Sequence, residues 1–405
     1  MPPNNAQRPL NLKAGNRSLD SWRFLRFKEI ADLGKERISP QNIAPGLACI
    51  ELENISKETG QMIGITDPSK QSSQKNIFYK GNVLFGKLRP YLKKYIYCDF
   101  DGVCSSEIWV LSSKNGCQSK FLFYLIQTSQ FIRVADQSSG TKMPRADWTN
   151  VSKLVVPIPP IPEQEEMIEI LSTWDHAIER VQRLIDAMQR LKAQLVSRLL
   201  SGQMRFPGFQ DEWKQVKLGT FLHPKFRKVV KPAGAYLRLG IRSHGKGTFT
   251  SVVDDPETIA LTHLFQARKN DLIVNITFAW EGAIALVGPE GDGALVSHRF
   301  PTYVFDTSKM LPEYFEHLMV TDRFFYELDL ISPGGAGRNR VMNKGDFLKI
   351  TVSIPGIEEQ KKIAGVLGGM DEQIGLLKKY LEKLKEQKKG LMQKLLTGEI
   401  RVKVE

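Results

Sequence analysis

The chain has 405 residues and a formal net charge of +13. A single hydrophobic core rarely organises so many residues, so two or three domains are expected. Charged residues make up 25% of the chain and hydrophobic residues 41%, which is ordinary for a globular protein. The positive charge favours a polyanionic partner such as nucleic acid, although many basic proteins bind nothing specific.

The N-terminus and the cysteines are typical of a cytoplasmic protein. Residues 1–20 are polar, lack the apolar segment of a signal peptide, and are expected to be a flexible N-terminal segment. No apolar run approaches the ~20 residues that a membrane span needs. Cys49, Cys98, Cys104 and Cys117 form no C-x-x-C pair, so neither a zinc site nor disulfides are indicated. We expect buried or half-buried free thiols in a reducing compartment.

The segment 157–202 recurs near the C-terminus. Gln164 and Gln360 correspond, at an offset of 360 − 164 = 196 residues. The offset holds without a gap from about residue 154 to 205 in the first copy, and from 350 to 401 in the second. Such a repeat divides the chain into alternating variable and helical blocks. The predicted segments are a flexible segment at 1–20, a first variable domain at 21–156, a central repeat helix at 157–204, a second variable domain at 205–352 and a C-terminal repeat helix at 353–405.

Both variable domains begin with a tryptophan followed by alternating basic and apolar residues, at Trp22 and Trp213. This period of two indicates a strand. Turn residues beside apolar runs predict further short strands, at 81–86 and 107–111 in the first domain and at 269–274 and 300–305 in the second.

One amphipathic helix is expected in each variable domain, at Ser119–Val134 and at Pro312–Leu328. A Gly-rich basic loop follows each helix, at 139–145 and 332–340, and a last strand leads into the repeat helix. Each variable domain is therefore predicted to be a mixed α+β domain.

Apolar residues of the two repeat helices recur in alternating steps of four and three, which is a heptad seam. The predicted helix–helix seam residues are Met167, Leu171, Trp174, Ile178, Val181, Ile185, Met188, Leu195 and Leu199 in the first helix, and Ile363, Leu367, Met370, Ile374, Leu377, Leu381, Leu384, Leu391 and Leu395 in the second. Each seam skips one position, at Lys192 and Lys388. A polar seam residue can fix the register at a cost in stability, whereas a lysine near a helix end can also extend into solvent.

Each repeat helix is expected to have about 36 residues and a length of about 54 Å. Two such similar stripes are most simply buried against each other in an antiparallel pair, which gives the chain a pseudo-two-fold axis. The alternative is that each helix packs on a partner protein, for which the lysines at the seam and Gly365, Gly368, Gly369 and Gly375 leave room.

Catalytic strings are missing from the sequence. No H-E-x-x-H, G-x-S-x-G or G-x-x-x-x-G-K-[ST] string occurs. The glycines of 334–337 could hold a phosphate but precede arginines rather than a Lys-Ser pair. The segment 275–278 lacks the prolines that an adenine methyltransferase needs, and the acidic turn 254–257 has no lysine at nuclease spacing.

The Pro-rich strands that run into Glu-Gln, at 158–164 and 354–360, carry a resemblance to a known family. With the alternation of variable domains and repeated helices, the chain resembles the specificity (S) subunits of type I restriction–modification systems from Trp22 to Val402. Further strings that fit are 86–92, 200–209, 279–284 and 297–300. The implied fold class is α+β, with two mixed α/β target-recognition domains separated by two long antiparallel helices that form a coiled-coil spacer with a pseudo-two-fold internal repeat.

The resemblance implies a non-catalytic DNA-recognition subunit of an adenine-N6 methyltransferase and ATP-dependent endonuclease complex. Each target-recognition domain would recognise one half of a bipartite, asymmetric site in double-stranded DNA, and the helices would set the spacer. Two methylation (M) subunits and two restriction (R) subunits are the implied partners. S-adenosylmethionine, ATP and Mg²⁺ would belong to these partners, with no cofactor or metal in this chain.

Base recognition requires loops that combine Arg or Lys with amide, hydroxyl and aromatic groups. The candidate DNA-binding residues of the first domain are Lys87, Arg89, Tyr91, Lys93, Ser105, Ser106, Thr141, Lys142 and Arg145. Those of the second domain are Arg227, Lys228, Arg242, His244, Lys246, Asn275, Thr277, Trp280, His298, Arg299, Arg338, Asn339 and Arg340. The alternatives are that many of these cations only contact phosphate or solvent and that Trp280 belongs to the core.

Two other classes of function remain open at this stage. The chain could be a self-contained DNA methyltransferase or nuclease–methylase, against which the missing catalytic strings argue. It could also be a basic coiled-coil scaffold, which would bind specific and random duplexes alike at about 150 mM salt.

Overall fold

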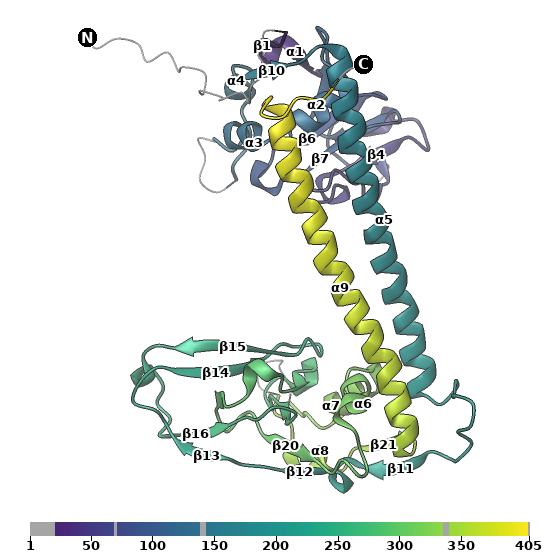
Figure 1. Ribbon diagram of the computed structural model, residues 1–405, viewed down its shortest axis with the longest axis vertical. Helices are drawn as coiled ribbons and strands as arrows, with labels where there is room; N and C mark the ends of the chain where they lie inside the picture. The colour runs from purple at the N-terminus through teal and green to yellow at the C-terminus, as the bar shows by residue number, and fades with distance from the viewer. Residues whose placement is uncertain (1–20, 69–70, 138–142, 335–339, 404–405) are drawn as a thin grey trace. The chain divides into compact units, whose positions relative to one another are not determined.

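The computed structural model describes residues 21–68, 71–137, 143–334 and 340–403. The chain forms two compact units, of which unit 1 is Met1–Gln182 with Tyr380–Glu405 and unit 2 is Arg183–Lys379. Each unit contains one mixed domain together with part of both long helices, α5 (Ile161–Leu200) and α9 (Ile357–Leu396) (Figure 1).

Domain 1, the mixed domain of unit 1, has a strand pair and two four-stranded sheets. These are β1 (Arg23–Arg26) with β10 (Val155–Ile158), then β2 (Ala31–Leu33), β9 (Ile108–Ser113), β6 (Val83–Gly86) and β7 (Tyr95–Tyr97) in that order, and β3 (Arg37–Ile38), β5 (Lys75–Phe78), β8 (Gly102–Ser105) and β4 (Ala48–Ile50) in that order. Its helices are α1 (Phe27–Ile30), α2 (Ser119–Leu125), α3 (Ser129–Ala135) and α4 (Trp148–Val151), with 3₁₀ turns η1 (Pro40–Asn42), η2 (Leu52–Asn54) and η4 (Pro90–Leu92).

Domain 2, the mixed domain of unit 2, repeats this plan with little sequence in common. Its strands are β11 (Lys214–Lys217) with β21 (Thr351–Ile354), then β12 (Leu222–Pro224), β20 (Thr302–Phe305), β17 (Leu272–Val274) and β18 (Ile284–Leu286) in that order, and β13 (Lys228–Val230), β16 (His263–Gln266), β19 (Leu295–Val296), β14 (Tyr236–Ile241) and β15 (Thr248–Val253) in that order. Its helices are α6 (Pro312–Leu318), α7 (Asp322–Leu330) and α8 (Lys344–Phe347), with 3₁₀ turns η5 (Leu218–Thr220), η6 (Pro256–Thr258), η7 (Ala279–Glu281) and η8 (Pro289–Gly291).

The two domains share the order of their strands, except that β15 adds a fifth strand beside β14 in domain 2. In both, the outer strand pair that precedes the long helix is antiparallel, and a parallel pair lies in the second sheet, β4 with β8 and β14 with β19. The mixed α+β class and the internal repeat predicted from the sequence are confirmed.

The prediction of a single amphipathic helix in each domain is wrong, because the structure has two short helices in its place, α2 and α3 in domain 1 and α6 and α7 in domain 2. In domain 1 the break falls before α3, where the Thr128 side chain caps the new helix by accepting from Phe131 N at 3.3 Å. In domain 2 the Thr321 side chain caps α7 by accepting from Phe324 N at 3.3 Å. A threonine cap satisfies a free helix N–H and so favours a new start, while the apolar period continues through the break.

Both long helices have 40 residues, a few more than predicted. Every predicted seam side chain is buried or half-buried. The ends of the seams pack into the domains. In unit 1, Met167 and Leu395 join the core of domain 1, and in unit 2 Leu199 and Ile363 join that of domain 2. The seams therefore attach each domain to the helices as well as pairing the helices.

Lys192 and Lys388 are ion-paired rather than free. In unit 1 the Lys388 Nζ lies 2.5 Å from Asp175 Oδ1, and in unit 2 the Lys192 Nζ lies 2.5 Å from Asp371 Oδ1. These pairs join an early turn of one helix to a late turn of the other, so the segments run antiparallel within each unit. The seam lysines thus contribute to register, and neither is a gap in the seam.

The four cysteines are free and buried, as expected from the sequence. Burial raises the pKa of Cys98 and Cys117 to about 12, which keeps both thiols protonated at neutral pH. No helix of the described chain is long and apolar enough to span a membrane.

The two ion pairs are predicted to differ in strength, because the Lys388 and Asp175 side chains are 11% and 30% exposed, whereas those of Lys192 and Asp371 are 23% and 50% exposed. A double-mutant cycle of Asp175→Asn and Lys388→Met should give a coupling free energy of about 1–3 kcal/mol. The matched cycle of Asp371→Asn and Lys192→Met should give less than about 1 kcal/mol. Urea unfolding measures both coupling free energies, and hydrogen exchange assigns the affected unit. Equal coupling free energies would contradict burial as the cause of the difference.

Candidate nucleic-acid interface

Each long helix begins with a buried Glu–Gln pair that attaches it to its domain. Glu163 accepts from Trp22 Nε1 at 3.1 Å and pairs with Arg401 at 2.5 Å. Gln164 accepts from Gln118 N at 2.8 Å and donates to Gly116 O at 2.7 Å. This network fixes the start of α5 against the base of domain 1.

Unit 2 repeats the network with the corresponding residues. Glu359 accepts from Trp213 Nε1 at 3.2 Å and pairs with Arg205 at 2.7 Å. Gln360 accepts from Leu311 N at 3.0 Å and donates to Lys309 O at 3.0 Å. In the sequence, Glu-Gln is recognisable only as a family marker. These polar pairs are buried against residues far away in the sequence, because Trp22 and Trp213 each lie more than 140 positions from the glutamate they contact. Their burial therefore has no local sequence signal.

Three segments converge in domain 1 to form what we call loop junction 1, namely Lys87–Leu92, Ser105–Glu107 and Pro144–Ala146. Lys87 N donates to Glu107 O at 2.9 Å, and Ala146 N donates to Lys87 O at 2.8 Å. Arg89 N also donates to Pro144 O at 2.8 Å. The junction brings together Lys87, Arg89, Tyr91, Ser105, Ser106 and Arg145 from the predicted set.

The corresponding segments converge in domain 2 as loop junction 2, namely Asn275–Trp280, Ser297–Arg299 and Arg340–Met342. Ile276 N donates to Arg299 O at 3.0 Å, and Met342 N donates to Ile276 O at 2.8 Å. The junction brings together Asn275, Thr277, Trp280, His298, Arg299 and Arg340.

A fourth segment lies beside each junction. Gly245 N donates to Gly282 O at 2.9 Å in domain 2, and Glu58 N donates to Lys93 O at 3.0 Å in domain 1. Both donor residues have left-handed backbone, with φ of 63°. Arg242, His244 and Lys246 are exposed on this segment. Its counterpart in domain 1 carries exposed Lys57, which the sequence analysis missed because the two segments share almost no residues.

Several predicted DNA-binding cations are held by neighbouring groups. The guanidinium of Arg227 lies 2.5 Å from Oδ2 of buried Asp271, and Lys93 Nζ lies 2.5 Å from Glu58 Oε1. Arg340 pairs with Asp329 at 2.7 Å and stacks over Trp280 at 5.0 Å. The Arg227 guanidinium is thus the counter-charge of a buried carboxylate in domain 2.

Other predicted cations point to solvent with fewer contacts. Lys228, Arg89 and His298 are exposed. Arg242 stacks over Phe249 at 5.0 Å and donates to Thr248 O. Thr141, Lys142, Arg338 and Asn339 lie outside the described residues.

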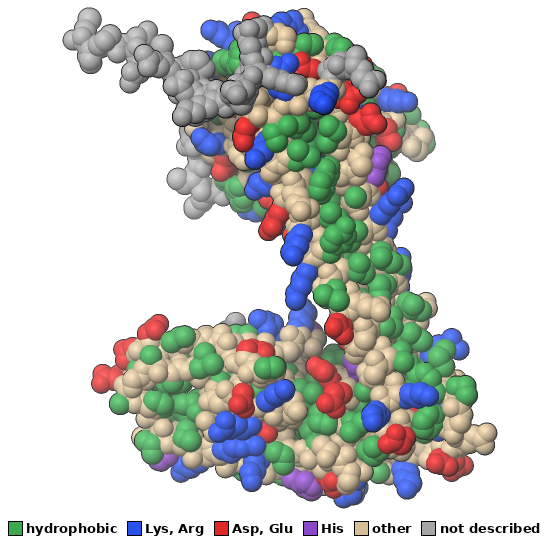
Figure 2. Space-filling view, in the orientation of Figure 1, with side chains coloured by type: hydrophobic (Ala, Val, Ile, Leu, Met, Phe, Trp, Pro, Cys, Tyr) green, Lys and Arg blue, Asp and Glu red, His purple; other side chains and the backbone are tan. Residues whose placement is uncertain are grey.

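Basic side chains are not gathered in one patch on the face of unit 2 drawn in Figure 2, where Lys and Arg are interspersed with Asp and Glu. The net charge therefore does not locate a DNA surface on this face. Among the described residues, no three His, Cys, Asp or Glu side chains are close enough together to hold a metal ion.

Comparisons with known proteins agree with the repeated architecture. Residues 20–189 and 211–386 match the family model for the type I restriction modification DNA specificity domain. Because the two matches cover most of its length, the chain belongs to the specificity subunits of type I restriction–modification systems.

Among curated relatives, the chain is 29% identical over 192 residues to the type I restriction enzyme EcoDI specificity subunit of Escherichia coli, covering 46% of this chain and 43% of that protein. It is 24% identical over 328 residues to the type I restriction enzyme MjaVIII specificity subunit of Methanocaldococcus jannaschii, covering 76% of each chain. The match to the EcoDI subunit thus spans less than half of that protein.

Solved structures share the fold. An S subunit of a type I restriction–modification system from M. genitalium superposes with a TM-score of 0.56 at 15% identity, covering 96% of this chain and 98% of that chain. A chain from a structural study of assembly and conformational transition in a type I system gives 0.53 at 18% identity, covering 94% and 97%.

Arg227→Met is predicted to destabilise domain 2 without altering DNA preference. The change leaves the Asp271 carboxylate, 3% exposed, with its bond from Arg268 N at 2.9 Å but without a counter-charge. A loss of about 3 kcal/mol is expected. The adjacent, exposed Lys228→Met is the matched control and should change stability by less than about 0.5 kcal/mol. Urea unfolding measures the stability of both variants. An unaltered unfolding midpoint for Arg227→Met would contradict a structural role for Arg227.

Proposed function

We propose that this chain is the non-catalytic DNA-recognition subunit of a type I restriction–modification complex. Domain 1 recognises one half of a bipartite, asymmetric site in double-stranded DNA, and domain 2 recognises the other half. The helices α5 and α9 set the spacer between the halves and dock two methylation subunits, to which restriction subunits are added. S-adenosylmethionine, ATP and Mg²⁺ belong to those partners.

One observation carries the proposal, which is that loop junctions 1 and 2 have the same backbone frame and different side chains. Junction 1 presents Lys87, Arg89 and Arg145, whereas junction 2 presents Asn275, Thr277 and Arg299 at other positions of the same frame. A common frame with variable polar side chains is what two readers of unrelated base sequences require, since base contacts specify and backbone contacts position.

The principal test is to co-express the chain with its methylation subunit and to map methylated adenines across a genome. Methylation confined to a bipartite sequence with a constant spacer is expected. The purified chain alone should neither bind S-adenosylmethionine nor transfer its methyl group. Binding that does not distinguish specific from random duplexes at about 150 mM salt would instead favour a basic scaffold.

Single substitutions in the two junctions should affect different halves of the site. Arg89→Ala in domain 1 and His298→Ala in domain 2 remove exposed side chains with little effect on packing. Each should relax base preference in one half only, by roughly 5- to 150-fold at the position contacted. Selection from a library randomised in both halves measures this, and relaxation of both halves by one substitution would argue against separate readers.

Inserting four residues into α5 should change the preferred spacer and leave the half-sites unchanged. The insertion lengthens the helix by about 6 Å and rotates the following segment by about 40°. Conservative substitutions at exposed helix positions such as Arg190, without insertion, are the control. A spacer that stays the same would mean that the helices do not measure the separation.

A further inference from the structure

Glu107 of domain 1 and Arg299 of domain 2 occupy the same position in their domains. In domain 1, Leu111 pairs with the first residue of β6, and Glu107 lies four residues before Leu111. In domain 2, Tyr303 pairs with the first residue of β17, and Arg299 lies four residues before Tyr303. The serine two residues before each also accepts its backbone N–H, at 3.4 Å in domain 1 and 3.3 Å in domain 2. A carboxylate and a guanidinium thus stand at one place on a common frame.

Glu107 is a carboxylate that lies among cationic residues of loop junction 1. Its Oε2 accepts from Arg145 Nε at 2.9 Å, and its side chain is 28% exposed. Lys87 and Arg89 belong to the segment bonded to its backbone. Within the described residues, Glu107 Oε1 has no hydrogen-bond donor. One acceptor oxygen therefore remains available at a part-exposed position beside Arg145.

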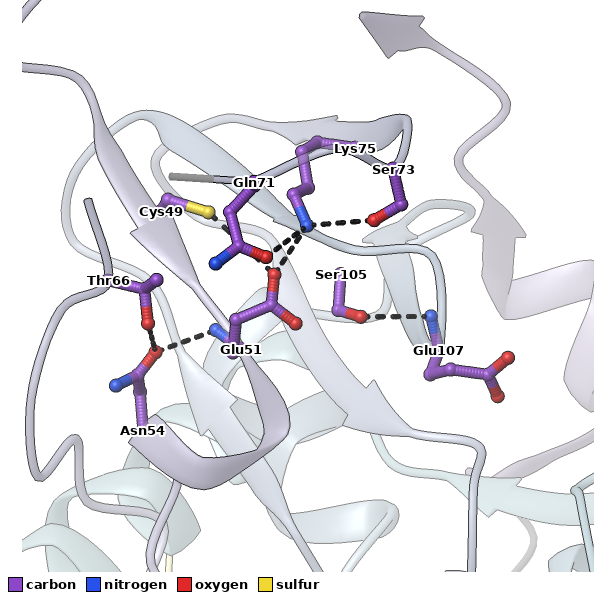
Figure 3. Close-up of polar contacts among 9 residues, drawn as sticks. All are labelled: Cys49, Glu51, Asn54, Thr66, Gln71, Ser73, Lys75, Ser105 and Glu107. Atoms are coloured by element: carbon purple, nitrogen blue, oxygen red, sulfur yellow. Dashed lines mark hydrogen bonds and ion pairs between the residues drawn. The ribbon is translucent and has the colours of Figure 1, made fainter. Parts of the chain in front are cut away.

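The turn that carries Glu107 rests on a rigid base. Ser105, at its start, pairs across the sheet with Lys75, which is 1% exposed (Figure 3). The Lys75 ammonium is fully paired and donates to Glu51 Oε1 at 2.6 Å, Ser73 Oγ at 3.1 Å and Gln71 Oε1 at 3.2 Å. A buried ammonium with three acceptors has little freedom to move, so the strand beneath the turn is fixed.

The other end of the turn is fixed as well. Asn76, 9% exposed, donates from Nδ2 to Ile108 O at 2.9 Å. Figure 3 shows the Glu107 side chain directed away from the Lys75 cluster. The carboxylate is therefore held outward by a pre-organised backbone, which lowers the ordering cost of a contact with a ligand.

Arg299 is presented in a similar way with the opposite charge. Its Nη1 donates to Thr277 Oγ1 at 3.2 Å, and the residue is exposed. Within the described residues it has no acidic partner, so its Nη2 edge is free to donate.

We propose that Glu107 and Arg299 are matched specificity determinants for the two half-sites. Glu107 accepts a hydrogen bond from the exocyclic amino group of a base, cytosine N4 or adenine N6, and Arg299 donates to guanine O6 and N7. Arg145 is a positioning residue that orients the Glu107 carboxylate and offsets its repulsion from phosphates. The assignment rests on the proposed function, since it requires each domain to recognise one half-site.

The test uses the full chain with its methylation subunit and a duplex library randomised in both halves. Glu107→Ala and the isosteric Glu107→Gln should each reduce discrimination at one base pair of one half, by roughly 5- to 150-fold. Arg299→Ala should do so at one base pair of the other half. Glu107→Gln should now tolerate bases that present an acceptor, because its amide adds a donor.

Glu36→Gln is the matched control, because this exposed carboxylate of domain 1 accepts from Tyr79 Oη at 2.7 Å, outside loop junction 1, and should leave both halves unchanged. Retained preference in the untouched half shows that a variant is folded and assembled. A uniform loss of affinity for all sequences, unchanged preference at every position, or an altered base in the half recognised by domain 2 would each overturn the role of Glu107. If the wild type shows no bipartite preference, the proposed function fails together with this assignment.

Discussion

A buried carboxylate at the start of each long helix is the constraint on which the rest of the structure depends. The Glu163 side chain is 8% exposed and that of Glu359 is 2% exposed, and a buried carboxylate without a counter-charge would cost several kcal/mol. The arginine that neutralises each one follows the end of the other helix, Arg401 for Glu163 and Arg205 for Glu359. Each unit therefore needs residues from both copies of the repeat, and the helix segments within it must run antiparallel.

This constraint separates the repeat in sequence from the unit in structure. A sequence repeat contains one helix with its flanks, whereas a structural unit contains a domain, the start of one helix and the end of the other. The indole N–H groups of Trp22 and Trp213 and the side chains of Gln164 and Gln360 complete the attachment, with the same partners in both units. The polar network thus fixes the frame and leaves the loops free to differ.

Loop junctions 1 and 2 show what that freedom permits. Their backbone hydrogen bonds are equivalent, but the side chains range from the Glu107–Arg145 pair to the Arg299–Thr277 contact. Charge at the same place is reversed between domains. Several predicted DNA-binding cations, Arg227 foremost, are paired with acidic side chains. A cation beside a buried acid cannot be distinguished by sequence from one that faces solvent.

The sequence by itself determined the class of fold, the repeat, the heptad seams and the family, because hydrophobic period and the 196-residue offset are local or one-dimensional properties. It did not reveal the helix breaks at Thr128 and Thr321, since the apolar period continues through them. Only the tertiary structure decided which cations are paired, which loops converge, and that Glu107 and Arg299 are equivalent. Those facts depend on contacts between residues far apart in the chain, whose partners no local pattern specifies.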